Sequence, residues 1–178
     1  MGWVVMLPVA GQSHGNDHVD DVLQHIPRLG VFVLNVCGVE SRTQGDVHYY
    51  TNTMGSYLLA AGVTAALKST VKEWRPDRSD RRSFPSGHAT FAFAGAHILQ
   101  KEYGQHSPWI SAGGYILATG VAIDRVVQDR HHWYDVCAGA AVGVLCTELT
   151  YFVTDRLFPA TQASVAIAPN GLMFSMRF

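Results

Sequence analysis

Charged side chains are scarce in this sequence. Asp, Glu, Lys and Arg together make up 15% of its 178 residues, whereas an average soluble domain has about 25%. Apolar residues make up 48%, which excludes a disordered chain, because such chains are poor in apolar residues. The composition therefore predicts a folded chain with a large buried or lipid-facing surface. The length is that of one domain, which we expect to span residues 1–178.

The sequence also lacks an excess of charge of either sign. Its 13 Lys and Arg against 14 Asp and Glu give a formal net charge of −1. Binding to nucleic acid requires a clear basic excess, so no nucleic-acid partner is expected. The three cysteines, Cys37, Cys137 and Cys146, are too few for a disulfide-rich scaffold.

Long uninterrupted apolar runs are absent as well. A clear membrane-spanning helix has about 18 or more consecutive apolar residues, and no stretch of this sequence meets that standard. The best candidates are Tyr57–Leu67, Trp109–Ile123 and Val136–Val153. Such runs fit buried helices of an all-α bundle and equally fit membrane-spanning helices, so the pattern leaves both open. A short or monotopic membrane association would satisfy both. Residues 1–10 lack the basic flank and the cleavage pattern of a signal peptide.

The patterns that are present predict an all-α chain. Helix-boundary residues place helices over 22–39, 55–74, 86–103, 108–127 and from 133 to just before Pro159, with connections at 11–21, 41–53 and 77–84. Gly139 and Gly143 are four residues apart, which predicts close packing against another helix. In the tail, residues 160–178, the pair Asn170-Gly171 lies between alternating apolar residues and predicts a short β-hairpin.

Two polar clusters lie near the middle of the chain. Lys68 and Arg75 are seven residues apart, which is two helical turns and places both cations on one helix face. Pro76 pushes Arg75 out of helical geometry and aims its guanidinium at the segment that follows. Further on, Ser86 and Gly87 open an apolar helix, and the free N–H groups at such an N-terminus bind anions. His88 follows directly. Each cluster alone also fits an ordinary structure, either a solvated basic face or a helix cap with a surface histidine.

A third cluster combines Arg125, His131 and Asp135. Asp135 lies beside His131 if this stretch is helical. A carboxylate that accepts from one imidazole nitrogen leaves the other nitrogen available as a nucleophile or base. The ordinary alternative is a weak surface ion pair. His132, three residues before Asp135, competes for the same carboxylate, and spacing alone does not decide between the two histidines.

Together the three clusters fit the chemistry of phosphate. An anion with three spread negative oxygens needs several cations and N–H donors, which here are Lys68, Arg75, Arg125 and the backbone of Ser86 and Gly87. His131 would attack phosphorus, and His88 would protonate the leaving oxygen.

The order and spacing of these residues resemble the type 2 phosphatidic acid phosphatase (PAP2) superfamily, which also includes class A bacterial acid phosphatases and vanadium haloperoxidases. The matching motifs lie within residues 68–135 and are Lys68-x6-Arg75-Pro76, Pro85-Ser86-Gly87-His88 and Arg125-x5-His131-x3-Asp135. One position departs from the pattern, because the family usually has serine where this sequence has Asp124. An acid there either weakens the hold of Arg125 on phosphate or turns outward without effect.

The resemblance implies a compact all-α helical bundle and a phosphoric ester hydrolase. Its reaction would be metal-independent hydrolysis of a phosphomonoester or pyrophosphate, above all on a lipid. In the family's scheme His131 forms a phosphohistidine, His88 is the general acid and Asp135 holds His131, while the phosphoryl oxygens are bound by Lys68, Arg75, Ser86, Gly87 and Arg125. No cofactor or metal is expected; His14 and His18 share a polar loop, which is a weak metal signal.

Other functions fit the same residues. A non-specific soluble acid phosphatase of the periplasm would use the same pocket, and so would a vanadate-dependent haloperoxidase, although those chains are typically far longer. A non-enzymatic membrane protein with a vestigial motif is a fourth class. The resemblance favours a membrane-associated enzyme with its active site facing the periplasm or exterior and a phosphorylated lipid or small phosphoester as substrate. The Lys and Arg distribution does not orient the chain, and the oligomeric state is not predicted.

Overall fold

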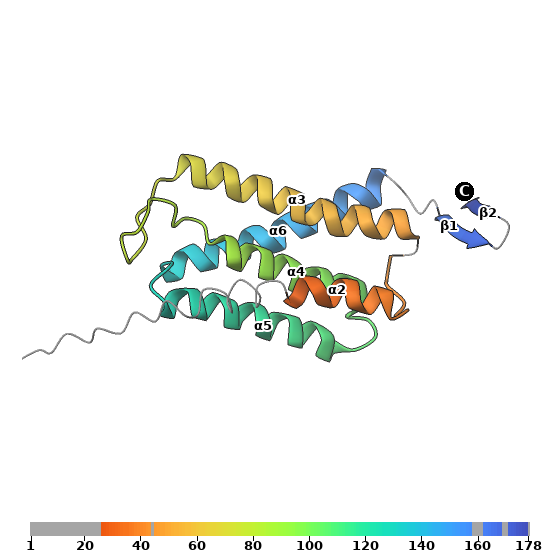
Figure 1. Cartoon of the computed structure of the whole chain (residues 1–178), viewed down its shortest axis with the longest axis horizontal. Coiled ribbons are helices and arrows are strands. Elements are labelled where there is room, and N and C mark those ends of the chain that lie inside the picture. Colours follow the sequence, from red (N-terminus) through yellow and green to blue (C-terminus); the bar gives the residue numbers. More distant parts are fainter. Residues whose placement is uncertain (1–25, 44, 158–161, 169–170, 178) are drawn as a thin grey trace, which may run out of the picture.

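Five helices make up most of the chain in a computed structural model that describes residues 26–43, 45–157, 162–168 and 171–177 (Figure 1). The helices are α2 (Ile26–Val36), α3 (Asp46–Thr70), α4 (Gly87–Tyr103), α5 (Pro108–Val127) and α6 (Trp133–Leu157). The expected connection over 11–21 lies outside the described residues. The all-α prediction is confirmed, and so are the expected bounds of the last three helices to within two residues.

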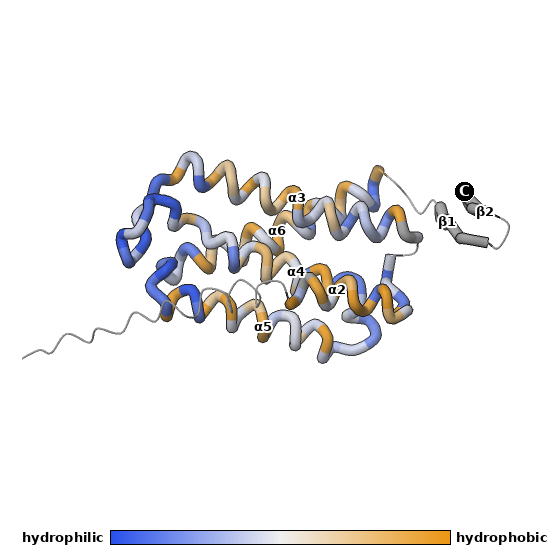
Figure 2. The backbone as a smooth tube through the Cα atoms, in the orientation of Figure 1, coloured by the Kyte–Doolittle hydropathy of each residue, from blue (hydrophilic) through white to orange (hydrophobic). Residues whose placement is uncertain are grey.

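The helices run alongside one another, and α4 packs against the other four (Figure 1). Its buried side chains join the main apolar core, which includes Val31, Tyr57, Ile98, Leu99 and Tyr151. Figure 2 shows that the most hydrophilic loops gather at one end of the bundle, where α3 ends, α4 and α6 begin and α5 ends. This polar end therefore collects residues from four helices.

Two glycines on α6 allow it to approach α4 closely. A Cβ atom at Gly139 would lie 2.5 Å from the carbonyl oxygen of Ser86, and one at Gly143 would lie 2.3 Å from that of Thr90. Real Cβ atoms do not come so near, so both positions require the absence of a side chain. The predicted close packing is confirmed, and it brings the start of α4 against the first turns of α6.

The bounds of α3 differ from the prediction at both ends. The helix begins at Asp46, inside the connection expected over 41–53, because tertiary packing buries Tyr49 and Asn52 in this polar stretch. It ends at Thr70, although the expected helix ran to residue 74. The hydroxyls of Ser69 and Thr70 both donate to the carbonyl oxygen of Ala66, and such bonds compete with continuation of the helix.

The tail forms the expected hairpin. Strands β1 (Gln162–Ala168) and β2 (Gly171–Arg177) pair in antiparallel register, with Val165 opposite Phe174 and Ala168 opposite Gly171.

Helices α5 and α6 are long and apolar enough to cross a membrane. Within the most apolar part of each, only 22% and 33% of the residues are buried, unlike the core helix of a soluble protein. Large apolar side chains are exposed along both helices, among them Trp109, Ile116, Ile123, Leu145, Leu149 and Phe152. The structure therefore favours lipid-facing helices over buried ones.

Candidate active site

The start of α4 lies at the centre of the polar end. Ser86 is the N-cap of the helix, and its hydroxyl accepts a hydrogen bond from the amide of Ala89. Its own amide donates to the backbone carbonyl of Asp135 at 3.0 Å. Gly87 is the first helical residue and the half-buried His88 is the second. The predicted helix N-terminus at Ser86 and Gly87 is therefore present and is joined directly to the first turn of α6.

Lys68 projects from the last turn of α3 toward this helix start. Its Nζ donates to the carbonyl oxygen of Arg82 at 2.8 Å, and its Cε would lie 4.0 Å from a Cβ at Gly87. Burial, together with the charges of Arg75 and Arg82, lowers the pKa of Lys68 from 10.5 to about 8. At pH 7 the side chain therefore still carries its positive charge.

Arg75 is not helical, as expected of a residue that precedes Pro76, and it therefore does not share a helix face with Lys68. Because α3 ends at Thr70, Arg75 lies in the loop that leads to α4. Its Nε is 3.1 Å from Oδ1 of Asp80, and its amide donates to the backbone carbonyl of Asp80. Its charge contributes to the lowered pKa of Lys68, so the loop brings the two cations close without a shared helix.

Arg125 is buried in the last turn of α5. Its Nη2 is 3.0 Å from Oδ2 of Asp124 and 3.3 Å from Oε1 of Gln128. Asp124 therefore turns toward the arginine rather than outward, which decides between the two alternatives for this unusual residue. Since the carboxylate neutralises the guanidinium, Asp124 competes with any anion that Arg125 would bind.

His131 is buried in the connection between α5 and α6. Its amide donates to the carbonyl oxygen of Arg125, and its Nδ1 lies 3.8 Å from Oδ2 of Asp135. Burial, followed by the positive charges of Lys68 and Arg75, lowers the pKa of His131 from 6.5 to about 4. The imidazole is therefore neutral at pH 7, with a lone pair on one ring nitrogen.

Asp135 is fully buried in the first turn of α6. Its Oδ2 accepts from the hydroxyl of Ser83 at 2.5 Å and from the amide of His132 at 2.9 Å. Nδ1 of His132 is 3.2 Å from the same oxygen, closer than Nδ1 of His131. The expected partnership of Asp135 with His131 therefore lies beyond hydrogen-bond distance, and His132 makes the nearer contact.

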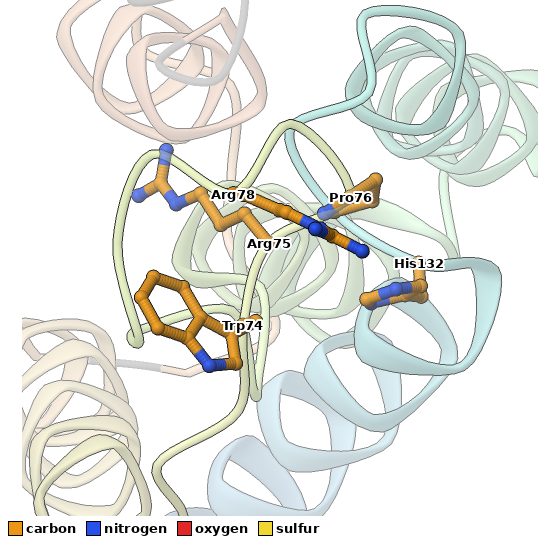
Figure 3. A pocket seen from close by; sticks show the side chains of 5 residues that line it. All are labelled: Trp74, Arg75, Pro76, Arg78 and His132. Carbon is orange, nitrogen blue, oxygen red and sulfur yellow. The ribbon is translucent and has the colours of Figure 1, made fainter.

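An open pocket of about 710 Å³ adjoins these residues. It is lined by Trp74, Arg75, Pro76, Arg78 and His132. Figure 3 shows that four of these side chains come from the loop after α3 and that His132 lies across from them at the start of α6. The volume exceeds what one phosphate group needs, which leaves room for part of the molecule that carries it.

The sequence analysis missed several residues that build this end of the molecule. Local sequence patterns indicate no role at this end for Ser83, Asp80, Glu73 or Tyr134. The hydroxyl of Tyr134 donates to Oε1 of Glu73, 61 residues away, and Ser83 bonds to a residue 52 positions on. No local pattern signals such pairs. Nor did spacing predict that ligand atoms of Glu73, His132 and Asp135 would lie within 4.8 Å of one another. The pair His14 and His18 lies outside the described residues.

Comparisons with known proteins identify relatives of this chain. The sequence profile of the PAP2 superfamily matches residues 48–159. The lipid A 1-phosphatase of Porphyromonas gingivalis is 36% identical over 149 residues, which cover 84% of this chain and 33% of that protein. A PA-phosphatase related-family protein of Dictyostelium discoideum is 26% identical over 76% of this chain and 62% of its own. The chain thus spans about a third of the length of the first relative.

The fold has a counterpart among solved structures. The crystal structure of Aquifex aeolicus LpxE superposes with a TM-score of 0.57 at 21% identity, over 79% of this chain and 88% of that one. At this identity the likeness concerns the fold alone.

Proposed function

Because the chain belongs to the PAP2 superfamily, we propose that it is a metal-independent phosphatase that hydrolyses a phosphomonoester or pyrophosphate on a lipid. The observation that carries the proposal is that Lys68 and Arg75 lie close to the buried His131, at the end of the bundle where α4 begins. Both cations lie near enough to lower the pKa of that histidine. A neutral imidazole beside concentrated positive charge suits attack on an anionic phosphate.

The reaction proceeds in two steps. A ring nitrogen of His131 forms a bond to phosphorus as the bond to the alcohol oxygen breaks. His88 gives a proton to that oxygen, and Asp135 stabilises the positive charge that develops on the phosphorylated imidazole. His88 then takes a proton from water, whose oxygen attacks phosphorus. The bond from phosphorus to nitrogen breaks, releasing inorganic phosphate and free His131.

The phosphoryl oxygens are held by charges and N–H groups at the polar end of the bundle. Lys68 and Arg75 supply charge, and the amides that open α4 at Ser86 and Gly87 supply donors. Arg125 contributes when a phosphate displaces Asp124 from its guanidinium. Removal of one donor of this kind typically costs about 10²–10³ in kcat.

The proposed substrate is a lipid phosphate. Two apolar helices support membrane association, and the name of the Porphyromonas gingivalis relative assigns that protein to lipid A. The pocket beside Arg75 has room for a headgroup. With the site at the polar end of the helices, the headgroup would reach the cations while the acyl chains stay in the bilayer. Following the family resemblance, this end faces the periplasm or exterior, and residues 1–178 form a single domain.

A substrate panel tests the proposal. Phosphate release should be measured from a lipid phosphate in detergent and from a short soluble phosphomonoester, each with and without EDTA. We expect faster release from the lipid, no loss of activity with EDTA, and loss of release in His131→Ala. Activity that requires an added metal, or that survives in His131→Ala, would contradict the mechanism. Preference for the soluble ester would contradict the substrate class.

A further inference from the structure

A second chemical feature adjoins the proposed catalytic residues. One ligand atom from each of Glu73, His132 and Asp135 lies within 4.8 Å of the other two. They come from three separate places: the loop after α3, the turn before α6 and the first turn of α6. One imidazole and two carboxylates form a donor set that suits Zn²⁺ and similar transition metals.

Neighbouring groups hold these three side chains in position. The hydroxyl of Tyr134 donates to Glu73, and the ring of Tyr134 stacks on that of His132 with centroids 4.9 Å apart and planes 7° apart. Nδ1 of His132 is 3.2 Å from Oδ2 of Asp135. The ligand atoms are therefore arranged before any ion arrives, which lowers the entropic cost of binding.

The buried carboxylate of Asp135 is a separate observation that points to a ligand at this site. Asp135 is fully buried, yet its Oδ1 has no hydrogen-bond partner among the residues that the structure describes. A buried carboxylate oxygen without a partner is costly, and such groups call for an explanation. A cation bound at this carboxylate is one such explanation.

We propose that Glu73, His132 and Asp135 bind one Zn²⁺ ion and that the bound ion inhibits the enzyme. Three protein ligands and a water complete a tetrahedral site. Mg²⁺ fits poorly because it prefers oxygen ligands in octahedral geometry. The inhibition part rests on the proposed function: a metal on Asp135 prevents this carboxylate from stabilising a positive charge on His131, and it fills the side of the pocket that His132 lines.

Metal binding can be measured without any activity. The purified full-length chain, stripped with a chelator, is titrated with Zn²⁺ by calorimetry and with Co²⁺ by visible absorption, with Mg²⁺ as a control ion. We expect one equivalent of Zn²⁺ and the strong visible bands of tetrahedral Co²⁺. Glu73→Gln and His132→Ala should each weaken binding at least tenfold. Tyr134→Phe should weaken binding only modestly, because it removes a hydroxyl that positions Glu73 but no ligand atom.

Two control variants make the test specific. A double variant, His14→Ala with His18→Ala, should keep its single equivalent, since those histidines are the other pair that the sequence offers to a metal. His131→Ala should also keep it, because His131 supplies no ligand. Binding that is absent from the wild type, or that is unchanged in Glu73→Gln and His132→Ala, would overturn the proposal. So would binding that disappears with the His14 and His18 pair.

The inhibitory role is tested separately on phosphate release. Zn²⁺ should inhibit the wild type at the concentration that fills the site, and Glu73→Gln should need at least tenfold more Zn²⁺ for the same fractional inhibition of its own metal-free rate. Stoichiometric binding without inhibition would overturn the regulatory part. A chain that binds Zn²⁺ through these three residues but releases no phosphate under any condition would contradict the proposed function and leave the metal site standing.

Discussion

Nδ1 of His131 lies 3.8 Å from Oδ2 of Asp135, close enough for charge interaction but too far for a hydrogen bond. Instead, Oδ2 of Asp135 forms hydrogen bonds with Ser83 and His132. In the proposed reaction His131 gains positive charge only when phosphorus bonds to it. The attraction to Asp135 is therefore strongest after attack, as expected of a group that stabilises the transition state rather than the resting enzyme.

The role of His88 can be separated from that of His131 by the choice of leaving group. His88→Ala should slow hydrolysis of an alkyl phosphate by about 10²–10⁴, because an alkoxide needs a proton to leave. The loss with p-nitrophenyl phosphate should be much smaller, because the phenolate leaves unaided. Steady-state rates on the two substrates test this, and equal losses on both would contradict the acid role.

The pKa of Lys68 predicts an alkaline limit to activity. The pKa of this lysine is lowered to about 8, so most of its charge is present at pH 7 and is lost as the pH rises through 8. Since phosphate binding uses that charge, kcat/KM should fall above pH 8. This is the parameter to measure, because its pH dependence reports the pKa values of groups in the free enzyme.

Lys68→Arg is the matched control for this pH profile. An arginine stays charged at every accessible pH, so the alkaline fall should move upward by more than one pH unit even if the maximal rate is lower. A profile that keeps its fall near pH 8 in Lys68→Arg would assign the limit to another group.

Asp124 should weaken the affinity of the site for anions. Asp124→Ser removes the ion pair with Arg125 and restores the residue usual in the family. Competitive inhibition by inorganic phosphate should become about two- to tenfold tighter, as expected for loss of a partly exposed competing charge. Asp124→Asn, which removes the charge but keeps an acceptor, should fall between the two. Weaker inhibition in Asp124→Ser would mean that Asp124 positions Arg125 for the phosphate.

Because α6 packs closely on α4, a side chain at Gly143 should lower the stability of the fold. The added Cβ in Gly143→Ala would lie 2.3 Å from the Thr90 carbonyl oxygen, and overpacking of this kind typically costs about 1–3 kcal/mol. Thermal unfolding in detergent should therefore show a clearly lower Tm. Gly62→Ala on α3 is the control, because its Cβ meets nothing within 4 Å and alanine favours helix. Equal Tm changes would refute the packing argument.

The parts of the site that follow from local sequence were predictable. Ser86, Gly87 and His88 open α4 because the cap and the apolar run are adjacent in the chain, and Gly139 and Gly143 mark the helix contact by their spacing. The predicted end of α3 was wrong because the hydroxyls of Ser69 and Thr70 donate back to a carbonyl of the helix. The periodicity of apolar residues does not indicate such bonds.

Contacts between distant segments were not predictable. Ser83 reaches Asp135 across 52 residues, and Tyr134 reaches Glu73 across 61. Which histidine lies nearer to Asp135 also depends on where α6 begins. The helix starts at Trp133, so His131 precedes it and the helical i,i+4 geometry assumed from the sequence does not apply. His132 gains the nearer contact for that reason.

The identity of the phosphorylated histidine is the most direct test of the account. The enzyme should be quenched during turnover of a ³²P-labelled substrate and the acid-labile, base-stable phosphate mapped by mass spectrometry in the wild type, His131→Ala and His132→Ala. The account predicts phosphate on His131 in the wild type, none in His131→Ala, and a phosphoenzyme that still forms on His131 in His132→Ala. Phosphate on His132, or a phosphoenzyme that persists without His131, would contradict it.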